Sequence, residues 1–179
     1  MTTMEDFAEF AASVSPRLRR TAFLLCGDWH TAEDLTQATL AKLFVVWRRI
    51  RRLEAVDAYA TRTLVNTYLA DRRKKRVKEQ PTSEVPDVPV EPAGPELRIA
   101  LMSALSALPP GARAVVVMRY WADMSVDQVA AALGCSSGNV KSQSARALAR
   151  LRPLLGEIAA ETGLLTGQPP EGPNGARSI

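Results

Sequence analysis

Residues 125–142 read SVDQVAAALGCSSGNVKS, and this pattern predicts two short helices joined by a tight turn. Ser125 and Gln128 have the spacing of a capping box, in which a hydroxyl and an amide each satisfy a free N–H group at a helix start. Gly134 stands where the short first helix must end, because glycine adopts a left-handed turn without steric penalty. Val140 is then spaced to pack back against the first helix. We therefore predict a helix-turn-helix motif.

The second helix of this motif carries a face rich in hydrogen-bond donors. Its donor-bearing residues are Asn139, Lys141, Ser142, Gln143, Arg146 and Arg150. Side chains of these types bind base edges and phosphates. An ordinary helical hairpin is the alternative, but a solvated helix face usually mixes in acids, and no Asp or Glu occurs from Ser136 to Pro153. The pattern favours DNA binding.

The residues around the motif are expected to complete a small helical core. Apolar residues recur at helical spacing before it, at Leu97, Leu101, Ala104, Leu105 and Leu108. The segment from Ala114 to Met118 holds three consecutive valines, but it is too short and isolated to build a sheet, so we interpret it as a buried helix. Packing roles are also expected for Tyr120, Trp121, Ala145, Leu148 and Leu151.

The N-terminal part of the chain contains a helix with two distinct faces. We expect it to begin with Thr31 as the capping residue, followed by acids that suit the helix dipole. The expected buried stripe consists of Leu35, Leu43, Val46 and Trp47. Asp34, Gln37 and Ala41 fall on another side at three-to-four spacing, a small polar surface suited to a partner helix. From these residues alone, a merely solvated face is the favoured alternative.

A dense basic region follows this helix. Arg48, Arg49, Arg51 and Arg52 precede a helix that begins near Glu54, carries Arg62 and ends in five consecutive bases, residues 72–76. The helix dipole explains part of that cluster, but neutralisation of phosphates explains five bases better and predicts binding that weakens with salt. Tyr59, Asn66, Thr67 and Tyr68 interleave with the bases and can stack on or bond to unpaired nucleotides. Core packing is an equal alternative for Tyr59.

Composition divides the 179 residues into helical parts and connecting segments. Residues 79–95 hold five prolines and four acids, which predicts an extended, flexible, acidic linker. No run shows the alternation typical of strands. We expect an all-α protein with one helical domain at residues 1–78 and a second, containing the helix-turn-helix, at residues 96–155. Residues 156–179 are expected to form a mobile tail.

Several functional classes are disfavoured by what the chain contains. The two cysteines, Cys26 and Cys135, lie far apart, and His30 is the sole histidine, so the ligands for a zinc site are missing. No metal, cofactor or small-molecule substrate is expected, and neither clustered carboxylates nor a Gly-rich phosphate loop indicates an enzyme. No window approaches the roughly 20 apolar residues that a membrane span needs. We expect a non-enzymatic protein of the cytoplasm with no membrane contact.

At this point the sequence resembles the extracytoplasmic-function (group IV) sigma factors of bacterial RNA polymerase, from about Phe7 to Leu154. Three blocks carry the resemblance. The first is Ala32–Gln37 with Trp47. The second runs from Tyr59 to Arg73 and includes Asn66 and Asp71. The third runs from Ala107 through Arg113, Arg119, Tyr120, Asp123 and Ser125 to Leu148. Each block is moderately specific, and their order with a linker between them is highly specific.

The resemblance implies binding to core RNA polymerase, through the clamp helices of its largest subunit and its flap, and to promoter DNA. The implied polymerase-binding residues are Asp34, Gln37, Ala38 and Ala41. Those implied at the −10 element are Arg51, Arg52, Asp57, Arg62, Asn66, Arg72 and Arg73. Those implied at the −35 element are Ser137, Asn139, Lys141, Ser142, Gln143 and Arg146. An anti-sigma factor as a further partner is left open.

Two departures from the family pattern limit what is carried over. Many relatives have an acid and a Phe where this chain has Ala38 and Leu40, which weakens the expected polymerase contact. Ala145 is small where some relatives place a bulky side chain, so their −35 sequence is not transferred.

The main alternative is a conventional helix-turn-helix regulator whose N-terminal half dimerises or senses a signal. It predicts tight duplex binding without polymerase, at a two-fold operator. It leaves the Asp34 and Gln37 surface and the basic region unexplained. A polymerase-associated adaptor without promoter recognition is a further alternative, in which the second helix of the motif only packs.

Overall fold

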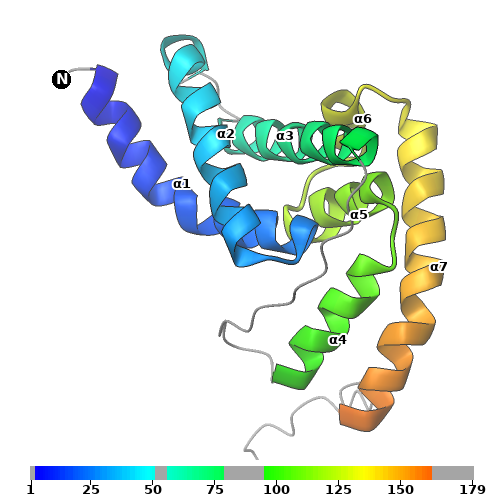
Figure 1. Ribbon diagram of the computed structural model, residues 1–179. Coiled ribbons are helices and arrows are strands. Elements are labelled where there is room, and N and C mark those ends of the chain that lie inside the picture. Colours follow the sequence, from blue (N-terminus) through cyan, green and yellow to red (C-terminus); the bar gives the residue numbers. More distant parts are fainter. Residues whose placement is uncertain (1–2, 51–55, 79–94, 163–179) are drawn as a thin grey trace, which may run out of the picture.

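The computed structural model describes residues 3–50, 56–78 and 95–162, and every regular element in these ranges is a helix (Figure 1). The elements are α1 (Thr3–Cys26), α2 (Trp29–Ile50), α3 (Val56–Lys78), α4 (Pro95–Ser106), α5 (Pro110–Val116), the π-helix η1 (Val117–Trp121), α6 (Val126–Leu133) and α7 (Ser137–Thr162). The expected all-α class is confirmed. Arg51, Arg52 and the predicted linker residues 79–94 lie outside the described residues. No helix in the described ranges is both long and apolar enough to cross a membrane.

The turn between α1 and α2 depends on two adjacent residues. Gly27 has a φ of 81°, in the left-handed region that favours glycine. Asp28 then accepts a 2.7 Å hydrogen bond from the backbone N–H of Thr31, so Asp28 is the residue that caps α2. The expectation that Thr31 caps the helix was wrong, because the helix begins two residues earlier, at Trp29.

α1, α2 and α3 pack around a shared apolar core. Leu18, Leu25, Leu43 and Leu64 are fully buried in it. At one end of this core Trp47 stacks on Phe10 and meets Phe7 edge to face. Trp47, Leu35 and Leu43 confirm the predicted buried stripe, whereas Val46 is half-buried at its edge.

The helix-turn-helix predicted from residues 125–142 is confirmed in α6 and α7. Ser125 and Gln128 form both bonds of the capping box, at 3.1 and 2.7 Å. Gly134 ends α6 with a φ of 65°, and the hydroxyl of Ser136 caps α7 by accepting the N–H of Asn139 at 3.2 Å. Val140 is fully buried with the apolar face of α6.

The three consecutive valines are helical and buried, as predicted, but the two aromatic residues that follow them are exposed. Tyr120 is 54% exposed and Trp121 is 51% exposed, so the expectation that both pack in the core was wrong. These residues lie in the π-helix η1, where the N–H of Ala122 bonds to the carbonyl of Val117, five positions earlier. The wider turn moves side chains off the 3.6-residue phase on which the prediction relied.

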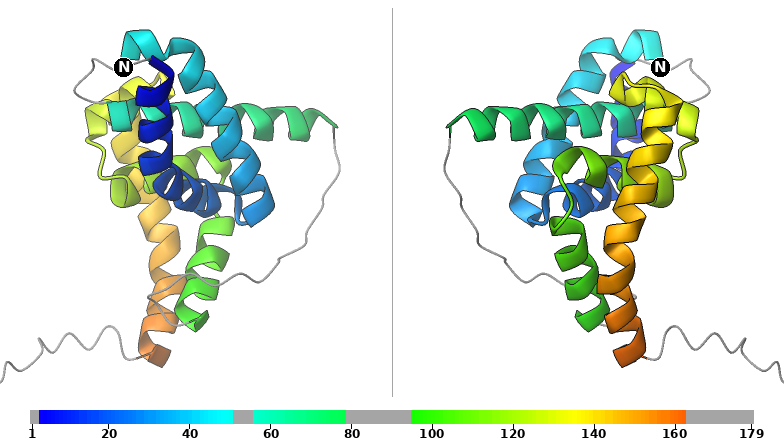
Figure 2. Two further views of the ribbon diagram at one scale, coloured as in Figure 1. Left: turned by 90° about the vertical axis from the view of Figure 1, so that its left-hand side faces the viewer. Right: turned by 90° about the vertical axis from the view of Figure 1, so that its right-hand side faces the viewer.

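The two halves of the chain pack against each other. Figure 1 shows α3 crossing toward α5 and α6, and contacts join α3 to both helices and α1 to α4, α5 and η1. One apolar cluster includes buried residues from α1, α2, α3, α5, η1, α6 and α7. α4 and α7 pack side by side and project away from the other helices (Figure 2). α7 continues to Thr162, beyond the expected end of the second domain at residue 155.

Candidate nucleic-acid interface

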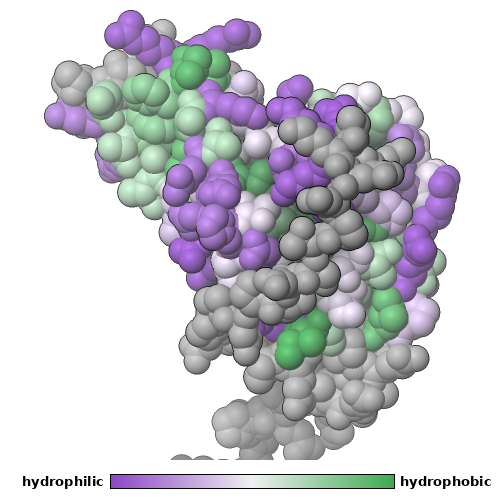
Figure 3. All heavy atoms as spheres, in the orientation of Figure 1, coloured by the Kyte–Doolittle hydropathy of each residue, from purple (hydrophilic) through white to green (hydrophobic). Residues whose placement is uncertain are grey.

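One face of α2 presents a continuous exposed stripe. Asp34, Gln37, Ala38 and Ala41 are all exposed, and each lies three or four residues from another member of the set. Val45 continues the same stripe one turn further and is 83% exposed, a value that makes it the most exposed large apolar side chain among the described residues. We call these five residues the α2 stripe. Figure 3 shows apolar and hydrophilic side chains intermixed over α1 and α2.

The carboxylate of Asp34, the charged group of the α2 stripe, has only a weak, exposed partner. The carboxylate of Asp34 lies 3.4 Å from the imidazole of His30, and both side chains are largely exposed. An exposed pair of this kind contributes little to stability. The carboxylate therefore remains accessible to a partner. The sequence prediction omitted Val45, although its position four residues after Ala41 was a signal for it.

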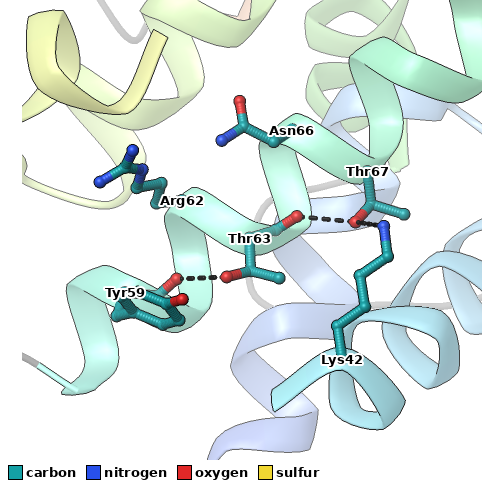
Figure 4. Close-up of a pocket in the computed structure, with 6 residues that line it drawn as sticks. All are labelled: Lys42, Tyr59, Arg62, Thr63, Asn66 and Thr67. Atoms are coloured by element: carbon teal, nitrogen blue, oxygen red, sulfur yellow. Dashed lines mark hydrogen bonds between the residues drawn. The ribbon is translucent and has the colours of Figure 1, made fainter. Parts of the chain in front are cut away.

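A pocket of about 370 Å³ lies between α2 and α3 (Figure 4). Its lining residues are Lys42, Tyr59, Arg62, Thr63, Asn66 and Thr67. It combines two cations, one phenol ring, two threonine hydroxyls and an amide. Cations that neutralise phosphates beside a ring that can stack on a base are the components of single-stranded nucleic-acid sites.

Hydrogen bonds fix the position of one cation in this pocket. Lys42 Nζ donates to Thr67 Oγ1 at 2.9 Å, and that hydroxyl donates to the carbonyl of Thr63 at 2.7 Å. The hydroxyl of Thr63 in turn donates to the carbonyl of Tyr59 at 2.8 Å. Lys42 and Thr63 were not among the predicted site residues. The signal for Lys42 was weak, because only the packing of α2 on α3 turns it toward this pocket.

The predicted −10 residues are dispersed along α3. Arg62 and Asn66 line the pocket, and Arg72 and Arg73 are exposed near the other end of the helix. Asp57, in the first turn of α3, pairs with Arg17 of α1 at 2.7 Å. The predicted residues Arg51 and Arg52 lie outside the described part of the chain.

Only one of the two tyrosines of α3 is available to a ligand. Tyr59 is half-buried at the pocket, whereas Tyr68 is 3% exposed in the core. Burial raises the pKa of Tyr68. The suggestion that Tyr68 stacks on an unpaired base is therefore wrong, because α3 turns this ring inward.

The first turns of α7 present most of the predicted −35 residues to solvent. Asn139, Lys141, Ser142 and Arg146 are exposed. Gln143 is half-buried, and its Nε2 donates to Oδ1 of Asn139 at 3.1 Å. The remaining predicted residue, Ser137, donates to a carboxylate oxygen of Asp127 in α6 at 2.6 Å. The structure therefore places these six residues together at one end of α7.

The buried face of α7 matches the predicted one only in part, because Leu151 is buried as predicted but Leu148 is only half-buried. Val140, Ser144, Ala147 and Leu151 are buried, at the spacing of one helix face. Ala145 is exposed, so its expected core role was wrong, and Ala147 occupies that side instead. Because Ala145 is small and exposed, it leaves room beside Arg146 on the donor-rich face.

The cysteines show no sign of a metal centre. Cys26 and Cys135 are free and only half-buried, and within the described ranges no three His, Cys, Asp or Glu side chains cluster as metal ligands. Burial raises the pKa of Cys26, which keeps its thiol protonated at neutral pH.

Comparison with known proteins relates both halves of the chain to one functional class. Residues 10–77 match the family model described as Sigma-70 region 2, and residues 98–151 match Sigma-70, region 4. The RNA polymerase sigma-E factor of Streptomyces coelicolor is 40% identical over 149 residues, which cover 82% of this chain and 84% of that protein. The ECF RNA polymerase sigma factor SigM of Mycobacterium tuberculosis is 36% identical over 79% of this chain and 73% of its own length.

Solved structures show the same arrangement of helices. The sigma factor RpoE of Bartonella quintana, solved in complex with the anti-sigma factor NepR, has a TM-score of 0.68 and 27% identity. The match covers 84% of this chain and 97% of that one. CnrH, solved in complex with the cytosolic domain of CnrY, has a TM-score of 0.62 at 22% identity, which is a likeness of fold.

Proposed function

Because this chain belongs to the extracytoplasmic-function family of RNA polymerase sigma factors, we propose that three of its surfaces divide the work of transcription initiation. The chain is a non-enzymatic sigma factor that partners with core RNA polymerase and promoter DNA and directs transcription initiation. The surfaces are the α2 stripe, the pocket between α2 and α3, and the donor-rich face at the start of α7. The assignment of individual residues to these tasks is our proposal.

The α2 stripe is proposed to bind the clamp helices of the largest polymerase subunit. Its residues Asp34, Gln37, Ala38 and Ala41 share one exposed helix face, and Val45 adds an apolar side chain. A stripe that joins two polar side chains to two alanines and an exposed valine suits another helix laid along it. The flap of the polymerase is proposed as the contact of the C-terminal half.

The pocket between α2 and α3 is proposed to hold the displaced strand of the −10 element. The observation that supports this most directly is the combination of Lys42, Arg62 and Tyr59 around one cavity. A captured base gives up its stacking in the duplex, which costs a few kcal/mol, so the site has to supply an aromatic face and cations. Asn66 can add a hydrogen bond to a base edge. Arg72 and Arg73 are proposed to bind phosphates. The segment from Arg51 and Arg52, outside the described residues, to Asp57 is proposed to hold a flipped-out base.

The start of α7 is proposed to enter the major groove at the −35 element. Asn139, Lys141, Ser142 and Arg146 are exposed there, and α7 itself carries no Asp or Glu before Glu157, whereas Asp127 of α6 accepts a hydrogen bond from Ser137. An α-helix fits the major groove, and arginine commonly binds guanine through two hydrogen bonds. Ser137 and Gln143 complete the proposed set, although both are engaged in hydrogen bonds within the protein.

The domain division at residues 1–78, 79–95 and 96–155 belongs to the same proposal. Two modules that bind DNA weakly alone gain effective concentration when polymerase holds both at one promoter.

We also propose that the chain works in the bacterial cytoplasm. The complex of the Bartonella relative with NepR supports the further proposal that an anti-sigma protein regulates it.

Co-elution and transcription test this function directly. Purified chain is mixed with bacterial core RNA polymerase, and run-off transcripts are sought from the DNA upstream of its own gene. Stable co-elution and transcripts that need both components are expected. Tight duplex binding without any polymerase binding would instead identify a conventional helix-turn-helix regulator.

A further inference from the structure

Two polar side chains in the first turn of α7 are held by hydrogen bonds within the protein. The hydroxyl of Ser137, the first residue of α7, donates to Oδ1 of Asp127 in α6 at 2.6 Å. Nε2 of Gln143 donates to Oδ1 of Asn139 at 3.1 Å, one turn back along the helix. The first turn of a recognition helix is the part that contacts base edges. Each bond therefore fixes which hydrogen-bonding atoms are left for a base.

The bond to Asp127 leaves Ser137 with acceptors only. A serine hydroxyl has one donor hydrogen and two acceptor lone pairs, whereas an ionised carboxylate has acceptors alone. The hydroxyl hydrogen of Ser137 points to Asp127, so its oxygen can only accept a further hydrogen bond. Asp127 is itself held in place, because it lies in the first turn of α6, which the capping box of Ser125 and Gln128 fixes.

The bond from Gln143 leaves Asn139 with donors. An asparagine side chain has a carbonyl oxygen that accepts hydrogen bonds and an NH2 group that donates them. Oδ1 of Asn139 is directed along the helix toward Gln143, so the NH2 group is the part that remains for a ligand. Asparagine commonly contacts adenine through two bonds, one of which needs the carbonyl oxygen. Gln143 therefore disfavours this two-bond contact.

The orientation of the Gln143 amide follows from its second neighbour, the start of α5. Its Oε1 lies 4.0 Å from the position that a Cβ on Gly111 would take, in the first turn of that helix. Pro109, the residue before α5, supplies no side-chain cap, so the free N–H groups there favour an oxygen nearby. With its oxygen toward α5, Gln143 turns its NH2 group toward Asn139. The opposite arrangement, in which Asn139 would present its oxygen, is thereby disfavoured.

Donors and acceptors on a protein select different bases in the major groove. Adenine and cytosine present an amino group there, whereas guanine and thymine present a keto oxygen at the corresponding place. The acceptor of Ser137 matches the amino bases, and the NH2 group of Asn139 matches the keto bases. Each residue is therefore expected to discriminate amino bases from keto bases, and not purines from pyrimidines.

We propose that Asp127 and Gln143 are positioning residues that set the base preference of α7. Asp127 makes Ser137 select an amino base, and Gln143 makes Asn139 select a keto base. This inference rests on the −35 function proposed above for α7, and it adds the chemistry of two contacts. Gln143 acts through Asn139, and Asp127 acts through Ser137 from a different helix.

Selection from a library of duplexes tests the inference. Promoter DNA from upstream of the gene is randomised over the −35 segment and incubated with the holoenzyme of full chain and core polymerase, and the bound DNA is sequenced. The full chain without polymerase is incubated with the same library in parallel. Ser137→Ala and Asn139→Ala identify the base pairs that these residues contact. At those positions the wild-type preference should weaken by about two- to tenfold, the contribution of one hydrogen bond.

The variants of the positioning residues should change preference in different ways. Asp127→Ala should erase the preference at the Ser137 position, because a released hydroxyl can donate as well as accept. Gln143→Glu should reverse the preference at the Asn139 position, because a carboxylate only accepts and therefore turns the NH2 group of Asn139 toward itself. Gln143→Ala should weaken that preference without reversing it. Asp123→Asn is the matched control, because it removes an exposed acid, tolerates the local φ of 50° and should leave both preferences unchanged.

Four results would overturn the inference. Wild-type preference in Asp127→Ala removes Asp127, and an unreversed preference in Gln143→Glu removes Gln143. Circular dichroism shows whether each variant is folded, and an unchanged preference in Gln143→Ala decides the question if Gln143→Glu is not. A purine-against-pyrimidine preference at both positions contradicts the assigned chemistry, and unchanged selection by Ser137→Ala and Asn139→Ala shows that neither residue contacts a base.

Failure of the proposed function gives a different result. Selection of DNA by the chain alone, with none by the holoenzyme, would contradict the −35 function. The preferences of the Asp127 and Gln143 variants, measured in the chain alone, would still test the two hydrogen bonds.

Discussion

The Nε of Arg113 donates a 2.6 Å hydrogen bond to the main-chain carbonyl of Leu24, although the two residues are 89 positions apart in the sequence. Leu24 lies in the last turn of α1, where carbonyl groups lack partners within the helix. A cation at this end also interacts favourably with the helix dipole. A residue of the C-terminal half thus completes the end of an N-terminal helix, and this couples the two parts of the sigma factor.

Arg146 is predicted to contribute base discrimination at the −35 element. Arg146→Ala should lose about 1–3 kcal/mol of discrimination, because a two-bond contact to a base carries a value of that order. Initiation rates on a set of −35 variants measure it. Arg150→Ala is the control, since a phosphate contact would weaken all sequences equally and reduce the salt dependence. An unchanged −35 preference in Arg146→Ala removes Arg146 from the reading set.

Asp34 and Gln37 are predicted to act in polymerase binding and not in the fold. Replacing both by Ala should weaken binding to core polymerase by about 1–2 kcal/mol, because interface side chains near the centre of a contact have effects of this size. Affinity is measured by titrating labelled chain with core polymerase. His30→Ala is the control, because it removes the ion-pair partner of Asp34 and leaves the α2 stripe itself unchanged. Wild-type affinity of the double variant refutes the assignment.

Tyr59 is predicted to stack on an unpaired base of the −10 element. Tyr59→Ala should weaken binding of single-stranded −10 DNA to the holoenzyme by about 1–3 kcal/mol, the usual contribution of one stacked base. Tyr59→Phe keeps the ring and is expected to bind like the wild type. Equal affinities for all three proteins would show that the ring only packs against its neighbours.

Asp28 is predicted to stabilise the start of α2 in a pH-dependent way. Hydrogen bonds from Thr31, first from its hydroxyl and then from its backbone N–H, hold the pKa of Asp28 below the usual range. A carboxyl group with a lowered folded pKa stabilises the protein fully above its unfolded pKa, about 3.9, and this contribution is lost as the pH falls through the folded pKa. Loss of a cap in Asp28→Ala should cost about 0.5–2 kcal/mol at neutral pH.

Urea denaturation at pH 7 and under acidic conditions measures the effect of Asp28. The difference between wild type and Asp28→Ala should shrink as the pH falls below about 4. Asp28→Asn is the matched control, because it can still cap the helix but has no charge to titrate. A difference that stays constant with pH would show that the charge of Asp28 contributes nothing.

Gly134 is predicted to be required for its left-handed backbone conformation and not for close packing. Its φ is 65°, and a Cβ at this position would meet no atom within 4 Å, so substitution strains the turn without any clash. Gly134→Ala should therefore lower the free energy of unfolding by about 1–2 kcal/mol. Gly134→Asn should cost less, because asparagine tolerates the left-handed region. Thermal unfolding followed by circular dichroism ranks the three proteins, and an equal cost for both variants contradicts the explanation.

Local signals in the sequence predicted much of the structure. The capping box of Ser125, the left-handed turn at Gly134 and the burial of Val140 depend on residues within one or two helical turns of each other, and all three were confirmed. The capping residue of α2 was assigned wrongly because Asp28 and Thr31 are both residue types that can cap a helix. The π-helix was missed because the prediction assumed the 3.6-residue period of an α-helix. For this reason Tyr120 and Trp121 were expected to be buried, whereas both are exposed.

Sites formed by one helix were predicted better than the site formed by two helices, because the sequence signals are local. The α2 stripe and the face of α7 each lie on one helix, so spacing alone brought their residues together. The pocket between α2 and α3 depends on how two helices pack: spacing places Thr63 on one face of α3 with Tyr59 and Asn66, but only the packing brings Lys42 of α2 to that face. The inward turn of Tyr68 also depends on neighbouring helices.

By itself, the sequence determined the helices, the helix-turn-helix and the acid-free donor face, because capping, turn geometry and helical periodicity act over a few residues. The tertiary structure alone decided that the two halves share a core, that Arg113 reaches Leu24, and that Asn66 is held against Ala132. Contacts across 66 to 100 positions depend on the complementary shapes of complete helices, and these shapes exist only once the chain has folded.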